Sequence, residues 1–258
     1  MHFACRAPGE SEAAPRAAPT VYAPCMRATK SHLLHLALWA ALAGCGGAAP
    51  HATAPAPGGA AHPAGDHDHR RFEDAEHWAR IFDDPARDAW QKPEEVISAL
   101  AVQPSARVAD LGAGTGYFAV RIARRVTEGA VYAVDIEEDM VRHLAERAAG
   151  ERLANLTPVL ATPADARIPE PVDLVLVVDT YHHIGDRVAY FRRLSGSLRP
   201  GGRLAIIDFT RESPIGPPPE HRIPAETVAQ ELARAGYAQV QAHGLLPNQY
   251  FLVFEPAP

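Results

Sequence analysis

The chain has 258 residues, of which 47% are hydrophobic and 22% are charged, so it can form a full core and is not of the disordered class. Its 31 acidic and 25 basic residues give a formal net charge of -6, which argues against a nucleic-acid partner because phosphate binding depends on Lys and Arg. The cysteines are Cys5, Cys25 and Cys45. The rest of the chain therefore has no disulfide framework, thiolate zinc site or cysteine nucleophile.

The N-terminal residues have the pattern of a targeting segment. Residues 1–25 are rich in Pro and Ala and are predicted to be a non-native or disordered extension, with translation starting at Met26. Basic residues then precede an apolar run, 33–43, that is too short to span a bilayer. The run ends in Leu-Ala-Gly-Cys at Cys45, which resembles the bacterial lipobox and predicts a lipid-anchored protein of the cell envelope. A chance apolar stretch in an Ala-rich tail is the alternative.

Residues 46–71 form an Ala-, Pro- and Gly-rich segment that is predicted to be a disordered tether. His62, His67 and His69 lie in or near its polar end, and we expect a solvated linker there rather than a metal site, because nothing fixes these ligands in a rigid geometry. The globular domain is predicted over 72–258, with a helical cap over 72–103.

Strands alternate with helices throughout the predicted domain. The hydrophobic periodicity predicts helices over 75–82, 86–100 (interrupted near Pro93), 118–126, 140–149, 187–198 and 225–235. Strands are predicted over 107–111, 131–134, 156–160, 172–178, 204–208, 240–242 and 250–254. This alternation predicts an α/β fold with a mainly parallel sheet covered on both faces. The last two strands follow one another without a helix, which indicates an antiparallel strand at that edge.

A glycine-rich loop follows the first strand and opens the next helix. The second strand ends at Asp135, where an acid meets ribose hydroxyls in nucleotide-binding folds. A dinucleotide fingerprint starting at Gly112 needs a small residue where this chain has Tyr117. Asp110 would also lie near a pyrophosphate, which is unfavourable. A carboxylate there instead favours a cationic ligand with an amino group and a sulfonium, such as S-adenosylmethionine (SAM).

Residues 106–209 resemble a class I SAM-dependent methyltransferase. Val-Ala-Asp-Leu-Gly-Ala-Gly-Thr-Gly is similar to the first motif of that family, and Val-Tyr-Ala-Val-Asp is similar to its second. Later matches follow in order: Thr-Pro-Ala-Asp ending at Asp165, the fourth strand with Asp179, and Leu-Arg-Pro-Gly-Gly-Arg-Leu. The resemblance implies a Rossmann-like, three-layer α/β/α fold with the sheet order 3-2-1-4-5-7-6 and strand 7 antiparallel. It also implies transfer of a methyl group from SAM to an unidentified small-molecule acceptor.

The resemblance further implies which residues bind the cofactor. The loop would pass beneath SAM with Gly112, Ala113, Gly114 and Gly116. Asp110 would face the amino-acid end of SAM. Asp179, at the end of the fourth strand, is also assigned to the cofactor site. Asp135 would accept hydrogen bonds from the ribose, and Ile136 would pack on the adenine. Asp165 would bind the exocyclic amine, or would serve as a helix N-cap or turn acid.

The segment after the fourth strand lies beside the methyl group in this fold. It contains Tyr181, His182 and His183, which are the candidate catalytic residues. Histidine is the natural base near neutral pH, and a base is needed when the acceptor must lose a proton. We expect one histidine to point inward while the other caps the following helix, and Tyr181 to line the sulfonium or the substrate. A structural role for these residues is the alternative.

Two other functions stay open from the sequence. One is a non-catalytic lipid-anchored protein that binds a nucleoside or related ligand, because export would separate the domain from SAM made in the cytosol. The other is an NAD(P)-dependent oxidoreductase, against which Tyr117 and Asp110 both count. A cytoplasmic location applies if the signal is not used. The sequence predicts no metal cofactor and leaves the oligomeric state open.

Overall fold

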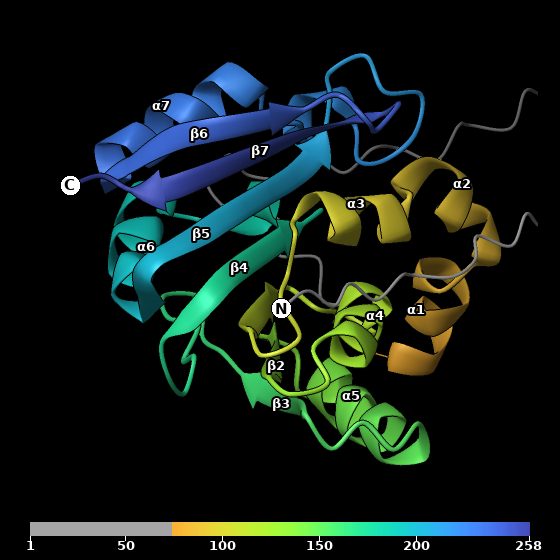
Figure 1. Ribbon diagram of the computed structural model, residues 1–258. Coiled ribbons are helices and arrows are strands. Elements are labelled where there is room, and N and C mark those ends of the chain that lie inside the picture. Colours follow the sequence, from red (N-terminus) through yellow and green to blue (C-terminus); the bar gives the residue numbers. More distant parts are fainter. Residues whose placement is uncertain (1–73) are drawn as a thin grey trace, which may run out of the picture. The chain divides into compact units, whose positions relative to one another are not determined.

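In the computed structural model, which describes residues 74–258, a seven-stranded sheet has the order β3-β2-β1-β4-β5-β7-β6 (Figure 1). The strands are β1 Arg107–Leu111, β2 Ala130–Asp135, β3 Leu156–Leu160, β4 Val172–Val178, β5 Leu198–Phe209, β6 Tyr237–His243 and β7 Gln249–Pro256. The first five are parallel, whereas β7 is antiparallel to both β5 and β6. The predicted order and the antiparallel edge are therefore confirmed.

Helices cover both faces of this sheet (Figure 1). The α-helices are α1 Ala75–Phe82, α2 Asp88–Gln91, α3 Pro93–Ala99, α4 Tyr117–Arg125, α5 Glu138–Gly150, α6 Arg187–Leu194 and α7 Ala225–Ala235. Four 3-10 turns, η1 Pro85–Arg87, η2 Tyr181–His183, η3 Ser195–Ser197 and η4 Pro219–His221, lie between the described helices and strands.

Alternate residues of each central strand enter two separate cores. In β4, Leu174 and Leu176 pack with α3, α4 and α5, whereas Val175 and Val177 pack with α6 and α7. Every side chain of β4 except that of Asp173 is buried, as expected for a parallel strand with helices on both faces. This burial fixes the strand register, and with it the place where each strand ends.

The predicted helix over 86–100 consists of three short elements. Lys92 has a left-handed backbone with φ 46°, and Pro93 follows as the first residue of α3. A residue before proline disfavours the helical region, so the chain turns there instead of continuing one helix. The predicted interruption near Pro93 is therefore confirmed, whereas the part before it is divided further into η1 and α2. The turn at Lys92 directs α1 and α2 over the strand ends.

The boundary between α6 and β5 also differs from the prediction. The α-helix ends at Leu194, one 3-10 turn follows, and β5 begins at Leu198 rather than at Leu204. Leu198 pairs with Val172, and the register shifts between Val172 and Leu174. The expected turn at Pro200 is accommodated as this irregularity within the strand, with Gly201 at φ 76°.

Several predictions fall outside the described residues. The signal segment 26–45, Cys45, the tether 46–71 and its histidines all lie before residue 74. Residues 74–258 belong to one unit, Ala61–Pro258. Within residues 74–258, none of the helices has both the length and the apolar character that crossing a membrane requires.

Candidate functional site

The glycine-rich loop links β1 to α4 at the carboxyl ends of the central strands. Gly112 and Ala113 each donate a backbone N–H to the carbonyl of Val134, at 2.8 and 3.0 Å. Gly116, with φ 94°, begins α4. These contacts hold the loop against the end of β2, where ligands bind in parallel α/β sheets.

Gly112 lies where no side chain fits. It has φ 75°, and an added Cβ atom would lie 2.2 Å from Oγ1 of Thr180. Thr180 itself is fixed, because its hydroxyl donates to the carbonyl of Val178 at 2.8 Å. The absence of a side chain therefore brings the ends of β1 and β4 into direct contact.

Asp135 and two exposed apolar side chains meet at the ends of β2 and β3. The Asp135 carboxylate accepts backbone N–H groups from Gly114 at 2.8 Å and from Glu137 at 3.0 Å. Burial raises the pKa of Asp135, and these backbone hydrogen bonds oppose that rise. Ile136 and Leu160 are 46% and 37% exposed, respectively. An acceptor group beside exposed apolar surface fits a sugar attached to a flat base.

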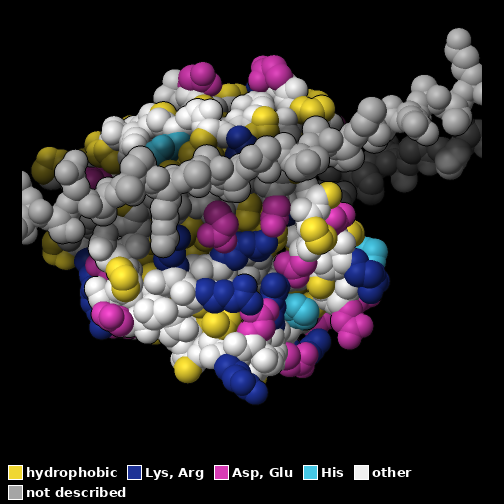
Figure 2. Space-filling model, turned by 45° about the vertical axis from the view of Figure 1, so that its right-hand side comes forward, with side chains coloured by type: hydrophobic (Ala, Val, Ile, Leu, Met, Phe, Trp, Pro, Cys, Tyr) yellow, Lys and Arg dark blue, Asp and Glu magenta, His cyan; other side chains and the backbone are white. Residues whose placement is uncertain are grey.

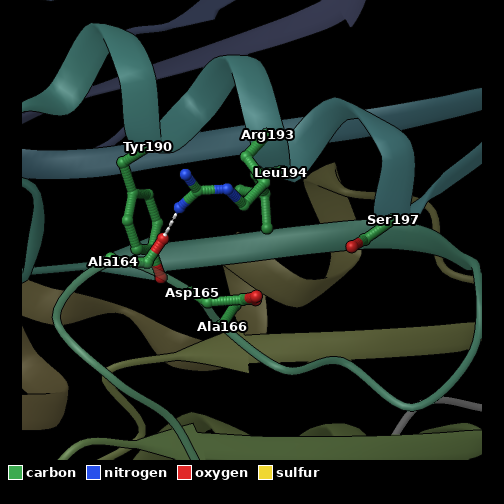
Figure 3. A pocket seen from close by; sticks show the side chains of 7 residues that line it. All are labelled: Ala164, Asp165, Ala166, Tyr190, Arg193, Leu194 and Ser197. Atoms are coloured by element: carbon green, nitrogen blue, oxygen red, sulfur yellow. Dashed lines mark hydrogen bonds between the residues drawn. The ribbon is translucent and has the colours of Figure 1, made fainter.

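Asp165 lies in the loop after β3 and is exposed. Its carboxylate accepts the backbone N–H of Arg167 at 2.9 Å, so it serves as a turn acid in this structure. Figure 3 shows the neighbouring pocket of about 20 Å³, across which Arg193 of α6 reaches the carbonyl of Ala164. That volume is close to the size of one water molecule, so this pocket is too small for a nucleoside.

Two buried acids mark the ends of β1 and β4. Burial raises the pKa of Asp110 to about 7, and the charge of Arg87 opposes this rise. Burial also raises the pKa of Asp179 to about 7, again against the charge of Arg87. Asp179 has a left-handed backbone with φ 53°. Acids with such displaced pKa values concentrate at functional sites.

A closed ring of polar side chains joins the helical cap to the strand ends. Arg87 donates to Asp179 at 3.3 Å and to the amide oxygen of Gln91 at 3.2 Å. Gln91 donates to Gln249 at 2.6 Å, and Gln249 donates in turn to Asp179. Gln91 is fully buried and Gln249 is 4% exposed. In addition, the ring of Phe82 lies 3.5 Å from the position that a Cβ atom on Gly114 would take. The cap therefore covers the glycine-rich loop.

His182 forms a buried pair with Asp208. Its Nδ1 lies 2.8 Å from one oxygen of Asp208 and 3.0 Å from the other. The side chains are 6% and 1% exposed, respectively. Burial by itself would lower the pKa of His182, but the hydrogen bond to Asp208 and the charges of Asp208 and Asp179 outweigh it and raise the pKa.

Tyr181 does not face the strand ends. Its ring is fully buried and stacks on Phe191, and its hydroxyl donates to Glu231 at 2.7 Å. Glu231 is also held by Arg187 at 2.6 Å. The expected contact of Tyr181 with the substrate is therefore wrong in this structure, because the side chain joins the α6–α7 layer.

The neighbouring histidine also differs from the expectation. The centroid of the His183 ring lies 4.1 Å from the centroid of the His182 ring. The N-cap of α6 is Asp186, whose side chain accepts the N–H of Ala189, and not a histidine.

The structure adds four residues to this site that the sequence analysis did not select: Arg87, Gln91, Asp208 and Gln249. Asp208 had a readable signal, because it is an acid near the end of a predicted strand. Arg87, Gln91 and Gln249 lie far from the strand motifs in sequence, and only the fold brings them together.

Ion pairs surround the cap on the outer surface. Figure 2 brings forward the side of the molecule that bears α1, α2 and α5 and shows Lys and Arg interleaved with Asp and Glu. Arg147 pairs with Asp83 at 2.9 Å, and Arg121 pairs with Asp88 at 3.1 Å. Among the described residues, no group of three or more His, Cys, Asp or Glu side chains is placed to hold a metal ion.

Comparison with known proteins agrees with this geometry. A family model described as a methyltransferase domain matches residues 108–202. Trans-aconitate 2-methyltransferase from Rhodopseudomonas palustris is 28% identical over 71% of this chain and 68% of its own length. Demethylmenaquinone methyltransferase from Roseiflexus castenholzii is 31% identical over 61% of this chain and 66% of its own length. The chain thus spans about two thirds of the length of these curated relatives.

A solved structure extends the match to the whole fold. A SAM-dependent methyltransferase from Aquifex aeolicus is 26% identical, has a TM-score of 0.65, and is matched over 97% of its length and 70% of this chain. These matches and the fold support a class I SAM-dependent methyltransferase. The cofactor of this methyltransferase is SAM, and methyl transfer from SAM to an acceptor is its reaction.

The residues of this methyltransferase fit SAM. Asp135 lies beside the exposed side chain of Ile136, which suits a nucleoside, and the buried Asp110 and Asp179 suit a cation.

Proposed function

We propose that this methyltransferase acts on a small-molecule acceptor that must lose a proton, such as a phenol or a carbon acid, and that His182 is the general base. The observation that carries this proposal is the buried hydrogen bond of 2.8 Å between Nδ1 of His182 and Asp208. A carboxylate held against Nδ1 orients the imidazole ring and stabilises it after it gains a proton. An acceptor that attacks through a free lone pair would need no such base.

The chain's own groups define the proton's route. Because the carboxylate of Asp208 accepts hydrogen bonds, Nδ1 of the neutral His182 ring carries the proton and Nε2 carries the lone pair. Nε2 takes the proton of the acceptor, and Asp208, which also accepts the backbone N–H of Phe209 at 2.8 Å, balances the new charge. SAM supplies the methyl group. Alignment and removal of this proton are what the protein contributes.

The surface and the relatives support a small acceptor. On the face that Figure 2 shows, acidic side chains lie among the basic ones around the cap, so this part of the described surface does not favour a nucleic acid. The names of two relatives specify small molecules, trans-aconitate and demethylmenaquinone.

The base is tested by substitution of the pair. A panel of small phenols and carbon acids is screened for production of S-adenosylhomocysteine (SAH). With an active acceptor, His182→Ala and Asp208→Asn are each expected to lower kcat by about 100-fold or more while SAH affinity is kept. A loss confined to His183→Ala would assign the base to the neighbouring ring, and full activity in both His182 and Asp208 variants would reject the proposal.

The pH dependence gives a second test of the same pair. Since the folded pKa of His182 is raised, its base form is populated only as pH rises through that value, and kcat is expected to rise with it. Asp208→Asn removes the hydrogen bond and charge that raise the pKa of His182. The rise in kcat is therefore expected at lower pH in this variant. An unchanged profile would contradict the role of Asp208.

We propose that Asp135 binds the ribose of SAM, that Ile136 packs on its adenine, and that Asp110 and Asp179 face its amino-acid end. The glycine-rich loop, with Ala113, lies beneath it. The two N–H groups that Asp135 accepts hold its carboxylate in place for the sugar hydroxyls. Calorimetry with SAH is expected to show that Asp135→Ala loses about 10- to 100-fold in affinity. Equal affinity in the variant would remove Asp135 from the site.

We also propose that Cys45 is lipidated and anchors the protein to the cell envelope. The support is the sequence alone: a short basic stretch, an apolar run and Leu-Ala-Gly-Cys. Expression from Met26 with a labelled fatty acid is expected to label the wild type and not Cys45→Ser. Unlabelled wild-type protein would reject the anchor and favour a cytoplasmic location.

A further inference from the structure

The amino-acid end of SAM carries two opposite charges on one carbon. Its ammonium group needs an acid, and its carboxylate needs a cation or N–H donors immediately beside that acid. Asp110 and Asp179 provide the acids, but the glycine-rich loop and the strand ends described above contain no Lys or Arg next to them, and His182 beside Asp179 is already paired with Asp208. A guanidinium or ammonium group for the carboxylate would come from another part of the chain.

Arg87 of the cap supplies a cation beside Asp179. Its guanidinium lies 3.3 Å from Asp179. Its positive charge opposes the rise that burial causes in the pKa of Asp110 and in that of Asp179. The Arg87 side chain is 14% exposed. It is placed by the carbonyl of Phe82 at 3.0 Å and by the ring of Tyr117, whose centroid lies 4.1 Å from Cζ. A planar guanidinium held in this way is suited to binding a carboxylate.

The ion pair between Arg87 and Asp179 can exchange partners without leaving an unpaired charge. An amino-acid group that enters between them places its ammonium beside Asp179 and its carboxylate beside Arg87. Each buried charge then keeps an opposite neighbour, which avoids the cost of an isolated charge. Gln91 accepts from Arg87 at 3.2 Å, Gln249 donates to Asp179, and the two amides bond to each other at 2.6 Å, so both partners of the ion pair are held in place.

We propose that Arg87 binds the carboxylate of SAM, and that the SAM ammonium group replaces Arg87 as the partner of Asp179. This inference rests on the proposed placement of Asp179 at the amino-acid end of the cofactor. Arg87 lies outside residues 108–202, so the cofactor site of this chain extends into its helical cap.

The test compares two ligands that differ only in the carboxylate. Calorimetry measures the binding of SAH and of decarboxylated SAH to the full chain, as the wild type and as Arg87→Met. The variant is expected to lose about 10- to 100-fold in affinity for SAH and to bind the decarboxylated ligand nearly as well as the wild type does. Arg87→Lys, which keeps the charge, is expected to recover part of the loss.

Arg121→Met is the matched control. Arg121 lies at the same 4.1 Å from the centroid of the Tyr117 ring but pairs with Asp88, away from the two acids. It is expected to bind both ligands as the wild type does. Thermal unfolding shows whether each variant is folded.

The outcomes separate this inference from the function itself. A loss in Arg87→Met that is equal for both ligands would mean that Arg87 only holds the cap, and would overturn the inference. Unchanged binding of SAH by Arg87→Met would also overturn it. If the wild type bound neither ligand, the cofactor assignment itself would fail. Loss of turnover in His182→Ala with normal SAH binding concerns only the base.

Discussion

Asp110 carries its unusual chemistry because of where it is buried, not because of its neighbours in sequence. It is 3% exposed at the end of β1, and burial raises its pKa from 3.8 to about 7. The folded state therefore holds this proton at pH values where the unfolded chain has released it. The contribution of Asp110 to the free energy of unfolding therefore decreases as pH rises from about 4 to about 7.

Ligand binding is expected to have the opposite pH dependence. The ammonium group of SAH binds an ionised acid, so SAH affinity is expected to increase as pH rises through about 7, where Asp110 and Asp179 lose their protons. Calorimetry across this range is the measurement, and Asp110→Asn is expected to flatten the response. A constant affinity in the wild type would show that neither acid titrates against the ligand.

Tyr250 offers a separate test at the level of one atom. Its backbone lies opposite that of Asp208 in the antiparallel pairing of β5 and β7. Its side-chain hydroxyl is buried without a hydrogen-bond partner. A buried, unpaired hydroxyl costs about 1–3 kcal/mol, so Tyr250→Phe is expected to leave the free energy of unfolding unchanged or higher. Chemical denaturation measures it. A loss of more than about 1 kcal/mol would indicate a bound water on this hydroxyl.

At the scale of elements, the β1–α4 loop depends on contact as well as on backbone conformation. Gly112 and Gly201 have nearly the same φ, 75° and 76°, but an added Cβ atom at Gly201 would meet nothing within 4 Å. Both alanine substitutions bear the left-handed strain of about 1–2 kcal/mol. Gly112→Ala also forces Thr180 away and adds about 1–3 kcal/mol of overpacking.

Comparison of Gly112→Ala with Gly201→Ala separates the effect of the contact with Thr180 from the effect of the left-handed backbone. Chemical denaturation is expected to find Gly112→Ala less stable than Gly201→Ala, and only Gly112→Ala is expected to weaken SAH binding. Equal losses of stability would mean that the ends of β1 and β4 can separate at little cost.

The β5–α7 connection is organised by one buried arginine. Arg222 is 7% exposed and donates to the carbonyls of Pro217, Arg211 and Ser213 at 2.7–2.8 Å. Arg222→Ala removes these donors and leaves carbonyls unpaired, so limited proteolysis is expected to cut this connection faster. Arg211→Ala, at an exposed position, is the control and is expected to match the wild type.

At the scale of the whole domain, the cap and the sheet form one binding unit. Phe82 lies over Gly114, and Arg87 and Gln91 connect the cap to β4 and β7. SAH is therefore expected to slow amide hydrogen exchange in α1 and α2 as well as at the ends of β1 and β2. Protection at the strand ends alone would show that the ligand does not engage the cap.

The strands could be predicted from the sequence because each depends on local patterns, and their order was implied by the resemblance to the methyltransferase family. Val172–Val178 is a continuous apolar run, and a βα alternation permits few arrangements. The interruption of the predicted helix over 86–100 could also be read from the sequence, because the steric effect of Pro93 on the residue before it is local.

The residues of the candidate site also divide into those whose place the sequence predicts and those whose place it does not. Asp110 and Asp135 lie at the ends of β1 and β2, and the glycines follow β1 directly, so their place at the sheet edge is a consequence of the chain order. The role of Tyr181 could not be read from its neighbours, because whether a side chain beyond a strand end turns toward the site or toward a helix depends on packing. Here the hydrogen bond from the Tyr181 hydroxyl to Glu231 of α7 holds the side chain toward the helices.

The sequence by itself determined the fold class, the strand order and the family's ligand, since hydrophobic periodicity and short motifs act over a few residues. Only the tertiary structure decided the partners: Asp208 for His182, Arg87 and Gln249 for Asp179, and Gln249 for Gln91. These contacts join residues 26 to 158 positions apart. Their geometry is fixed by the packing of whole helices and strands, which no local pattern records.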